Sequence, residues 1–273
     1  MRFVSLSSSS EGNSALISYK NTNILVDCGL TKKKILESLR EYDLTLDDID
    51  YIFITHEHTD HTKGLSEILK NHNIKVISQR STLIKIKDDC EKKNGYVNTD
   101  NFKVIMPLNS FNKENYFTAK DIKVYPIKGK HDVPAIFYKF VLGNTIVAIL
   151  TDMGRYSEYV IKSLYDVNYL MLECNYDRER LMDSNYPEFL KLRIMGEGGH
   201  LSNVDTSEII MRIANPGLKE VYLAHISKDT NDEEYALTFT KRYLKEYYKG
   251  NFSLPKIAVA KRKEITEIIN IID

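Results

Sequence analysis

Four potential metal ligands, His56, His58, Asp60 and His61, occupy a stretch of six residues. Burying three imidazoles and a carboxylate so close together is costly unless they share a cation. The alternate spacing lets His56 and His58 face one metal ion while Asp60 and His61 face another. Imidazole nitrogen with carboxylate oxygen suits zinc, manganese or iron. The sequence therefore predicts a site for two divalent metal ions, zinc or manganese, with iron as a further option.

Three more candidate ligands follow apolar runs that resemble strands. Asp152 and His225 each stand at the end of such a run, and His131 comes shortly after the run at 121–126. Side chains placed beyond the C-terminal ends of several strands converge at one edge of an α/β sheet. A single histidine in such a place is more often structural, but the combined set includes five of the seven histidines. We therefore expect these three residues to complete the metal site.

The elements that must position these residues are short strands alternating with helices. Strand patterns occupy residues 2–6, 15–19, 23–27, 50–54, 75–78, 168–173 and 220–224, with further strands throughout 103–150. Helical patterns occupy residues 32–42, 62–71, 205–214 and 232–248, and residues 175–202 read as irregular. Two sheet-rich halves predict an α/β fold, a four-layer αββα sandwich of two mixed sheets with helices outside. We expect a single domain, 1–273, whose halves meet near residue 150.

Local signals mark some boundaries. The dipeptide Gly143-Asn144 between two strand patterns predicts a hairpin turn. Asp205 and Glu208 have capping-box spacing, which predicts that a helix begins at Asp205. The Lys-rich residues 85–93 are typical of a solvated helix face or loop.

The composition restricts the compartment and the partners. Lys plus Arg equals Asp plus Glu at 38 each, so net charge favours neither a nucleic-acid nor a membrane partner. A nucleic-acid substrate would need a local basic patch. No apolar run is long enough to span a membrane, and Cys28 and Cys174 end apolar runs as buried thiols do. We expect a cytoplasmic protein, and the sequence does not indicate its oligomeric state.

The order of these motifs resembles that of the metallo-β-lactamase superfamily, and the similarity spans nearly the whole chain. The shared features are H-x-H-x-D-H, a later single histidine, T-D-x-G and a last histidine after a strand. The resemblance implies that the ligands of the first metal are His56, His58 and His131. It implies that those of the second are Asp60, His61 and His225, with Asp152 bridging both.

A narrower resemblance is to the YycJ/VicX (WalJ)-like group of bacterial metallohydrolases. It is carried by SLSSSSEGNS at 5–14, ILVDCGL at 24–30, YPEFLKLRIMGEGGHLSN at 186–203 and LAHISKDTN at 223–231. The resemblance implies phosphodiester hydrolysis, with 5′-to-3′ exonuclease action on DNA as the first expectation. The Gly/Pro-rich arm and the long insertion that mark other branches of the superfamily are not found in this sequence.

The expected chemistry is attack at phosphorus by a water molecule that two metal ions hold and acidify. Asp60 is a candidate to orient this water or accept its proton, and plain metal ligation is an equally good role. His200, in a Gly-Gly-His-Leu-Ser-Asn turn, is a candidate to bind phosphate or to protonate the leaving oxygen. Its alternative role is a helix-entry histidine bonded to nearby backbone.

Residues around the motifs have supporting roles in this hypothesis. Asp27 is expected to orient a ligand histidine. Ser9, Ser10 and Asn13 form either one wall of the site or merely a hairpin turn. Five cations flank the motifs and could form a phosphate-binding rim, although each alone is more typical of a solvated charge. They are Lys128, Lys130, Arg155, Arg193 and Lys228.

Two other function classes fit the same residues. A thioesterase or small-molecule phosphodiester hydrolase would use the same dinuclear site, and it would need a narrow pocket instead of an open basic cleft. A non-catalytic regulatory binding protein would use metal for stability alone, against which the open ligation speaks. The first hypothesis remains a hydrolase with a nucleic-acid substrate, DNA, and no membrane partner.

Overall fold

The structure, a computed structural model, describes residues 1–107 and 112–271. Its strands are β1 (Arg2–Ser9), β2 (Gly12–Tyr19), β3 (Thr22–Val26), β4 (Tyr51–Phe53), β5 (Lys75–Ser78), β6 (Phe102–Val104), β7 (Phe117–Ala119), β8 (Ile122–Lys128), β9 (Ile136–Leu142), β10 (Thr145–Leu150), β11 (Tyr169–Glu173), β12 (Glu220–Ala224), β13 (Lys256–Val259) and β14 (Thr266–Asn270). Its α-helices are α1 (Lys32–Arg40), α2 (Thr59–Thr62), α3 (Leu65–Asn71), α4 (Arg80–Asn94), α5 (Glu158–Ser163), α6 (Arg178–Asp183), α7 (Glu188–Met195), α8 (Asn203–Ile213) and α9 (Glu233–Tyr247). Short 3-10 helices are η1 (Leu46–Asp48) and η2 (Thr99–Asn101).

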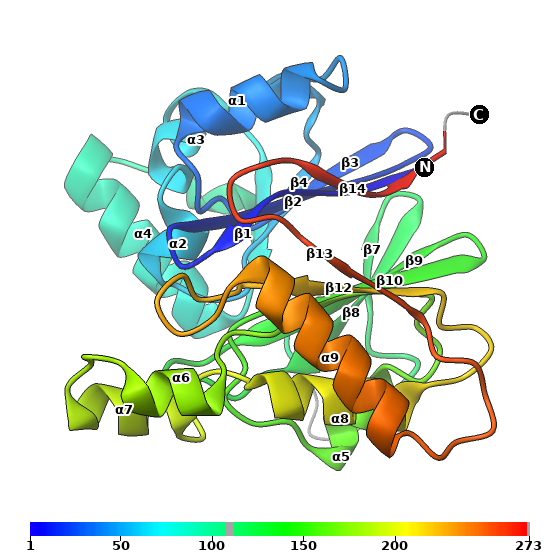
Figure 1. The fold of residues 1–273 in the computed structure, drawn as a ribbon. Helices are drawn as coiled ribbons and strands as arrows, with labels where there is room; N and C mark the ends of the chain where they lie inside the picture. The colour runs from blue at the N-terminus through cyan, green and yellow to red at the C-terminus, as the bar shows by residue number, and fades with distance from the viewer. Residues whose placement is uncertain (108–111, 272–273) are drawn as a thin grey trace.

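The strands form two sheets with helices on their outer faces (Figure 1). Within the described residues each sheet has seven strands. The first has the order β14-β1-β2-β3-β4-β5-β6, and the second the order β13-β12-β11-β10-β9-β8-β7. Both sheets are mixed, because β3 to β6 and β10 to β13 pair in parallel and the other neighbours pair antiparallel. The expected four-layer sandwich is confirmed.

Successive side chains of each buried strand point into different core layers. Phe53 of β4 faces the second sheet, where its ring centroid lies 5.1 Å from that of Tyr138. Its neighbour Ile52 joins Ile35 and Leu39 of α1 in the core outside the first sheet. A corresponding core lies between the second sheet and helices α5, α8 and α9. These layers hold both sheets in place, so the strand ends that carry polar residues are positioned from both sides.

The division of the chain between the sheets differs from the expectation. β10 ends at Leu150 in the middle of the second sheet, so the halves do not meet near that residue. The chain leaves the first sheet after β6 and enters the second at β7, and β14 then returns to pair with β1. This return brings Ile271, the last described residue, beside Met1, whose carbonyl oxygen accepts from the Ile271 backbone nitrogen at 2.9 Å. Figure 1 shows β14 alongside β1. The short edge strands β13 and β14 lie in a charged segment whose pattern predicted no strand.

Residues 175–202 are not irregular throughout, because they contain α6 and α7. Helix α7 lacks a regular apolar stripe: Phe189 and Leu192 are exposed, whereas Lys191 is buried. The next helix begins earlier than expected, since its N-cap is Ser202. Asp205 is the last residue of that capping box, at the third position of the helix, and not its first, because its carboxylate accepts from the Ser202 backbone.

Several local expectations are confirmed. Leu142 pairs with Thr145 across the two-residue turn at Gly143-Asn144, and Gly143 adopts φ of 64° as such a turn requires. Cys28 and Cys174 are buried and form no disulfide.

In the part of the chain that the structure describes, every helix is too short or too polar to cross a bilayer.

Candidate metal centre

Six strands end at one edge of the sandwich, and each is followed or ended by a polar residue. These are Asp27 after β3, His56 after β4, His131 after β8, Asp152 after β10, Glu173 at the end of β11 and His225 after β12. The short helix α2 adds Asp60 and His61. All seven histidines lie in the described residues, and six of them gather here; the seventh, His72, pairs with Asp47 on the surface.

The first ligand group consists of His56, His58 and His131, whose candidate ligand atoms lie within 4.8 Å of one another. His56 Nε2 lies 3.0 Å from His58 Nδ1. His131 Nδ1 donates to the carbonyl oxygen of Gly199 at 3.0 Å, which leaves Nε2 as its remaining ligand atom. Three converging imidazole nitrogens could hold one zinc or manganese ion and leave room for further ligands.

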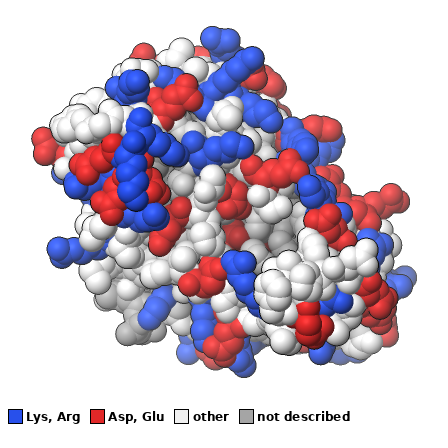
Figure 2. Space-filling view, turned by 90° about the vertical axis from the view of Figure 1, so that its left-hand side faces the viewer, with Lys and Arg blue, Asp and Glu red and all other residues white. Residues whose placement is uncertain are grey.

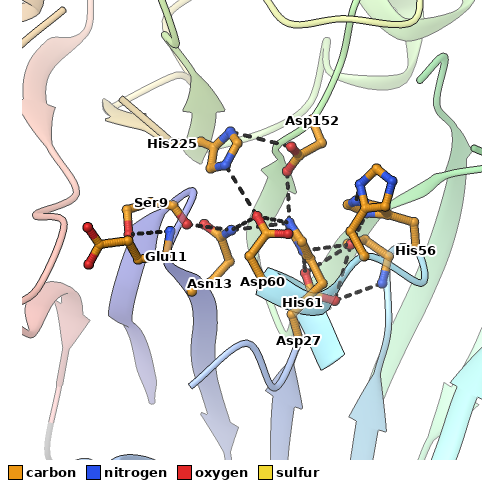
Figure 3. Close-up of polar contacts among 12 residues, drawn as sticks. Ser9, Glu11, Asn13, Asp27, His56, Asp60, His61, Asp152 and His225 are labelled. Atoms are coloured by element: carbon orange, nitrogen blue, oxygen red, sulfur yellow. Dashed lines mark hydrogen bonds and ion pairs between the residues drawn. The ribbon is translucent and has the colours of Figure 1, made fainter. Parts of the chain in front are cut away.

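The second ligand group consists of Asp60, His61, Asp152 and His225, again with candidate ligand atoms within 4.8 Å (Figure 3). His61 Nε2 lies 2.9 Å from Asp152 Oδ2 and 3.5 Å from Asp60 Oδ2. His225 Nε2 lies 3.7 Å from Asp60 Oδ2. The rings of His56 and His61 have centroids 4.1 Å apart, so the two groups adjoin.

A buried carboxylate orients the second group from behind. Asp27 Oδ2 lies 2.8 Å from His61 Nδ1, while Oδ1 accepts from the backbone nitrogen of Thr55 at 2.8 Å. The Thr55 hydroxyl in turn lies 3.0 Å from His56 Nδ1. A carboxylate behind a histidine fixes its tautomer and raises its basicity as a ligand. The contact expected between Asp27 and a candidate ligand histidine is therefore present.

Glu173 is a second such carboxylate, and it is not among the site residues expected from the sequence. It is fully buried, and its Oε1 lies 2.9 Å from His225 Nδ1 and 2.8 Å from His200 Nδ1. Its oxygens also accept from the backbone nitrogens of Asp152 and Met153 at 3.2 and 2.9 Å. The available signal was a charged residue ending an apolar strand, the same signal that identified Asp152.

His200 lies beside both groups. Its ring centroid is 5.4 Å from that of His131 and 5.3 Å from that of His225. Its backbone nitrogen does bond to a nearby carbonyl, that of Ile194. The side chain nevertheless points into the candidate centre, where it is 22% exposed and held by Glu173.

Three residues of the centre have left-handed backbone conformations: Asp27 (φ 60°), Asp152 (φ 63°) and His225 (φ 50°). Such a conformation costs a residue with a side chain about 1–2 kcal/mol. Hydrogen bonds hold it in place, since the His225 nitrogen donates to Ser8 Oγ at 2.8 Å and the Asp152 nitrogen donates to Glu173. Backbone strain that the surroundings maintain is typical of functional sites.

Burial lowers the pKa of a histidine and a nearby carboxylate raises it, and the balance of the two differs between the ligand groups. In the second group burial disfavours a charged histidine, but nearby carboxylates, Asp152 first, outweigh it and raise the pKa of His225 to about 10. In the first group burial prevails and lowers the pKa of His56 and of His131. The carboxylates that would attract a cation therefore lie in the second group, whereas His56 and His131 of the first present neutral imidazoles.

Two buried atoms test whether these residues fit a cation. Asp152 Oδ2 and His225 Nε2 make no hydrogen bond to any residue that the structure describes. Oδ2 lies 2.9 Å from His61 Nε2, close enough for both atoms to bind one ion. A buried carboxylate oxygen and a buried ring nitrogen without a hydrogen-bond partner are costly, and a shared cation relieves that cost. The donor set fits divalent metal ions.

The expected basic rim is largely neutralised. Arg193 pairs with Asp132, whose Oδ1 lies 3.3 Å from Nε2 of both His58 and His131. In the sequence, only the position of Asp132 directly after His131 could have marked it as a site residue. The other rim cations also have partners: Lys130 and Arg155 pair with Glu197, Lys228 pairs with Glu11, and Lys128 is likewise not free. Figure 2 shows acidic and basic side chains intermixed on one face.

Comparisons with known proteins agree with this fold. Residues 22–226 match the family model described as the beta-lactamase superfamily domain. The chain is 31% identical over 237 residues to exodeoxyribonuclease WalJ of Streptococcus pneumoniae serotype 2, covering 85% of this chain and 83% of that protein. It is 30% identical over 247 residues to exodeoxyribonuclease YycJ of Bacillus anthracis, covering 90% of each.

Among solved structures, the metallo-beta-lactamase fold protein YhfI from Bacillus subtilis is similar, with a TM-score of 0.68. The match covers 98% of this chain and 100% of that one at 18% identity, which shows the fold alone. The family model, the two relatives and the strand-end histidines lead to one assignment. The chain belongs to the metallo-β-lactamase superfamily, within its YycJ-like group of hydrolases.

Proposed function

We propose that the chain is a metal-dependent nuclease that degrades DNA as a 5′-to-3′ exonuclease. The observation that carries the proposal is the pair of adjoining ligand groups, which suits two metal ions side by side. The two curated relatives, both named exodeoxyribonucleases, support the choice of DNA as substrate.

Seven side chains would hold the two divalent ions, zinc or manganese. They are His56, His58 and His131 in the first group and Asp60, His61, Asp152 and His225 in the second. When bound, such ions activate a water molecule and neutralise charge on the phosphoryl oxygens.

The protein's own residues place protons at the reacting atoms. Glu173 binds His200 through Nδ1, so Nε2 remains to donate a proton to the leaving oxygen as the phosphorus–oxygen ester bond breaks. Asp60 is partly exposed and its Oδ2 lies 3.3 Å from Asn13 Nδ2, so it can orient the attacking water while serving as a ligand.

The test is hydrolysis of duplex DNA labelled at either end by protein loaded with manganese or zinc. We expect stepwise shortening from the 5′ end, lost in His58→Ala. His72→Ala is the matched control, because His72 pairs with Asp47 away from the centre and its loss should leave the rate unchanged.

Two further substrates separate the alternatives. Intact DNA together with cleavage of a thioester or a small phosphodiester would assign the same centre to another substrate class. Metal-loaded protein that cleaves none of the three would instead support a binding protein.

A further inference from the structure

A groove of about 920 Å³ opens beside Asp60. One end is formed by Asp60, by Ser9 at the end of β1 and by the β1–β2 turn that follows it. The groove continues along α1 and the connection between β13 and β14. Figure 3 shows Ser9 and Glu11 on the side of Asp60 opposite His56. The groove therefore extends the candidate metal centre away from the first ligand group. Its volume is near the upper end of the range for small-ligand sites, about 300–1,000 Å³.

Four cations line this groove, and one of them, Lys263, pairs with Glu11. The other three come from separate elements: Lys34 in α1, Lys63 after α2 and Arg262 between β13 and β14. Within the described residues, no side-chain nitrogen of these three lies within 4.0 Å of a carboxylate oxygen. Lysine and arginine side chains without a partner beside a catalytic centre are suited to bind an anionic substrate.

Arg262 is the most firmly placed of the three. Its backbone nitrogen donates to Glu233 at 3.0 Å, and its carbonyl oxygen accepts from Ser7 Oγ at 2.7 Å. Its Nε is buried and has no hydrogen-bond partner among the described residues. A guanidinium group held in this way offers several donors to a phosphate.

The acidic residues of the groove are mostly neutralised already. Three of its four glutamates pair with lysines: Glu11 with Lys263, Glu37 with Lys33 and Glu264 with Lys261. The fourth, Glu41, has no such pair among the described residues. Three unpaired cations thus face one unpaired glutamate. On the opposite side of the centre, Arg155 and Arg193 are paired with carboxylates.

We propose that this groove is the track for the phosphodiester backbone of the nucleic-acid strand whose scissile phosphate lies at the metal centre. Lys34, Lys63 and Arg262 contact successive phosphates. The inference rests on the proposed function and adds the path of the strand. The described residues that line the groove include no aromatic side chain, so the strand is held by its backbone and not by base stacking.

The test compares wild type with the triple variant Lys34→Ala, Lys63→Ala, Arg262→Ala on single-stranded DNA of about 20 nucleotides. We expect a rise of about tenfold or more in KM, with little change in kcat. The dependence of log(kcat/KM) on log salt should become shallower by about 0.7 for each cation removed. Hydrolysis of bis(p-nitrophenyl) phosphate, which is too small to occupy the groove, should stay at the wild-type rate.

Lys245→Ala, at an exposed position of α9, is the control for the loss of one surface charge, and Arg262→Lys should retain part of the binding. If the triple variant still degrades DNA with an unchanged KM and an unchanged salt dependence, the groove does not hold the strand and the proposal is wrong. Binding of a fluorescent oligonucleotide, measured by anisotropy without turnover, separates the two proposals. If wild type binds DNA more tightly than the triple variant but does not cleave it, the groove still binds the strand and the proposed nuclease activity is wrong. Equal binding by wild type and the triple variant would reject the groove as the binding site.

Discussion

Glu173 links three parts of the candidate centre. It holds His225 and His200 through their Nδ1 atoms and fixes the strained backbone at Asp152. Burial opposes its ionisation, but the charge of His200 and hydrogen bonds from His200 and His225 outweigh this and lower the pKa of Glu173 to about 2. The residue is therefore an anion at neutral pH. We assign it a positioning role, since it acts through the histidines.

Glu173→Gln should weaken metal binding while preserving the fold. The amide keeps the shape of the side chain but turns an NH₂ group toward donors that need an acceptor. Loss of a carboxylate behind a ligand histidine lowers metal affinity by about 10- to 100-fold. Competition against a fluorescent zinc chelator measures this change, with exposed Glu179→Gln as the control. Equal affinities for Glu173→Gln and wild type would remove the positioning role.

At the scale of elements, the turn after β3 holds α2 in place. Cys28 donates its backbone nitrogen to the His61 carbonyl at 2.8 Å, and Gly64 donates to the Cys28 carbonyl at 2.8 Å. Between them, Gly29 lies so close to α2 that an added Cβ would be 1.6 Å from the Asp60 carbonyl oxygen. Only glycine permits this approach, which sets the position of Asp60 and His61.

Gly29→Ala should therefore displace α2. Because the opposing atom belongs to the backbone, the clash cannot be relieved by a side-chain rotation, and we expect the free energy of unfolding to fall by about 1–3 kcal/mol. Urea denaturation measures the change, and zinc affinity should fall with it. Gly217→Ala, whose nearest contact would be a side-chain oxygen at 3.0 Å, serves as control. A Gly29→Ala protein as stable as this control would contradict the argument.

The layered fold was predictable, because apolar residues recur with different spacing in strands and in amphipathic helices. In β4, for example, the neighbours Phe53 and Ile52 pack into cores on opposite faces of the sheet. Helix α7 was not, since exposed Phe189 and buried Lys191 break its pattern. The ligand roles remain a prediction, although the structure brings the candidate residues together. Glu173 ends an apolar run, a signal that it shares with Asp152, but only Asp152 also lies in a motif, T-D-x-G. Asp132 has no signal beyond its place after His131.

At the scale of the whole molecule, the candidate centre lies across the boundary between the two sheets. His56 and His61 follow the first sheet, whereas Asp152 and His225 follow the second. The packing between the sheets therefore determines the distance between ligands, and a metal ion that binds both sides links the two halves. Any ligand that binds only the folded state raises its stability.

The buried cysteines report on the two outer cores, since Cys28 and Cys90 lie in the core outside the first sheet and Cys174 in the core outside the second. Burial raises the pKa of Cys174 to about 12, and burial also raises that of Cys28 and of Cys90. A raised pKa keeps the thiol protonated below that value, so the reactive thiolate is scarce at pH 8. We expect Ellman's reagent to modify no thiol rapidly in the native protein and three after denaturation in guanidinium. Rapid modification before unfolding would show a looser core.

The linkage between metal and folding should depend on pH. In metal-free protein the pKa of His225 is raised from 6.5 to about 10, so its contribution to stability is complete below about pH 6.5 and is lost as pH rises toward 10. Metal binding must displace that proton, and each proton released makes affinity rise by about tenfold per pH unit. Metal therefore stabilises the protein more as pH increases, opposite to the trend of the metal-free protein.

Calorimetry at pH 6, 7 and 8 gives the melting temperature of the protein with zinc and with a chelator. The quantity to follow is the difference between these two melting temperatures at each pH. We expect this difference to widen from pH 6 to pH 8 in wild type and in His72→Ala, because His72 is remote from the centre. It should be much smaller in Asp152→Asn, which removes the carboxylate that faces both His61 and His225. A difference independent of pH would mean that metal binds without displacing these protons, and therefore outside the second ligand group.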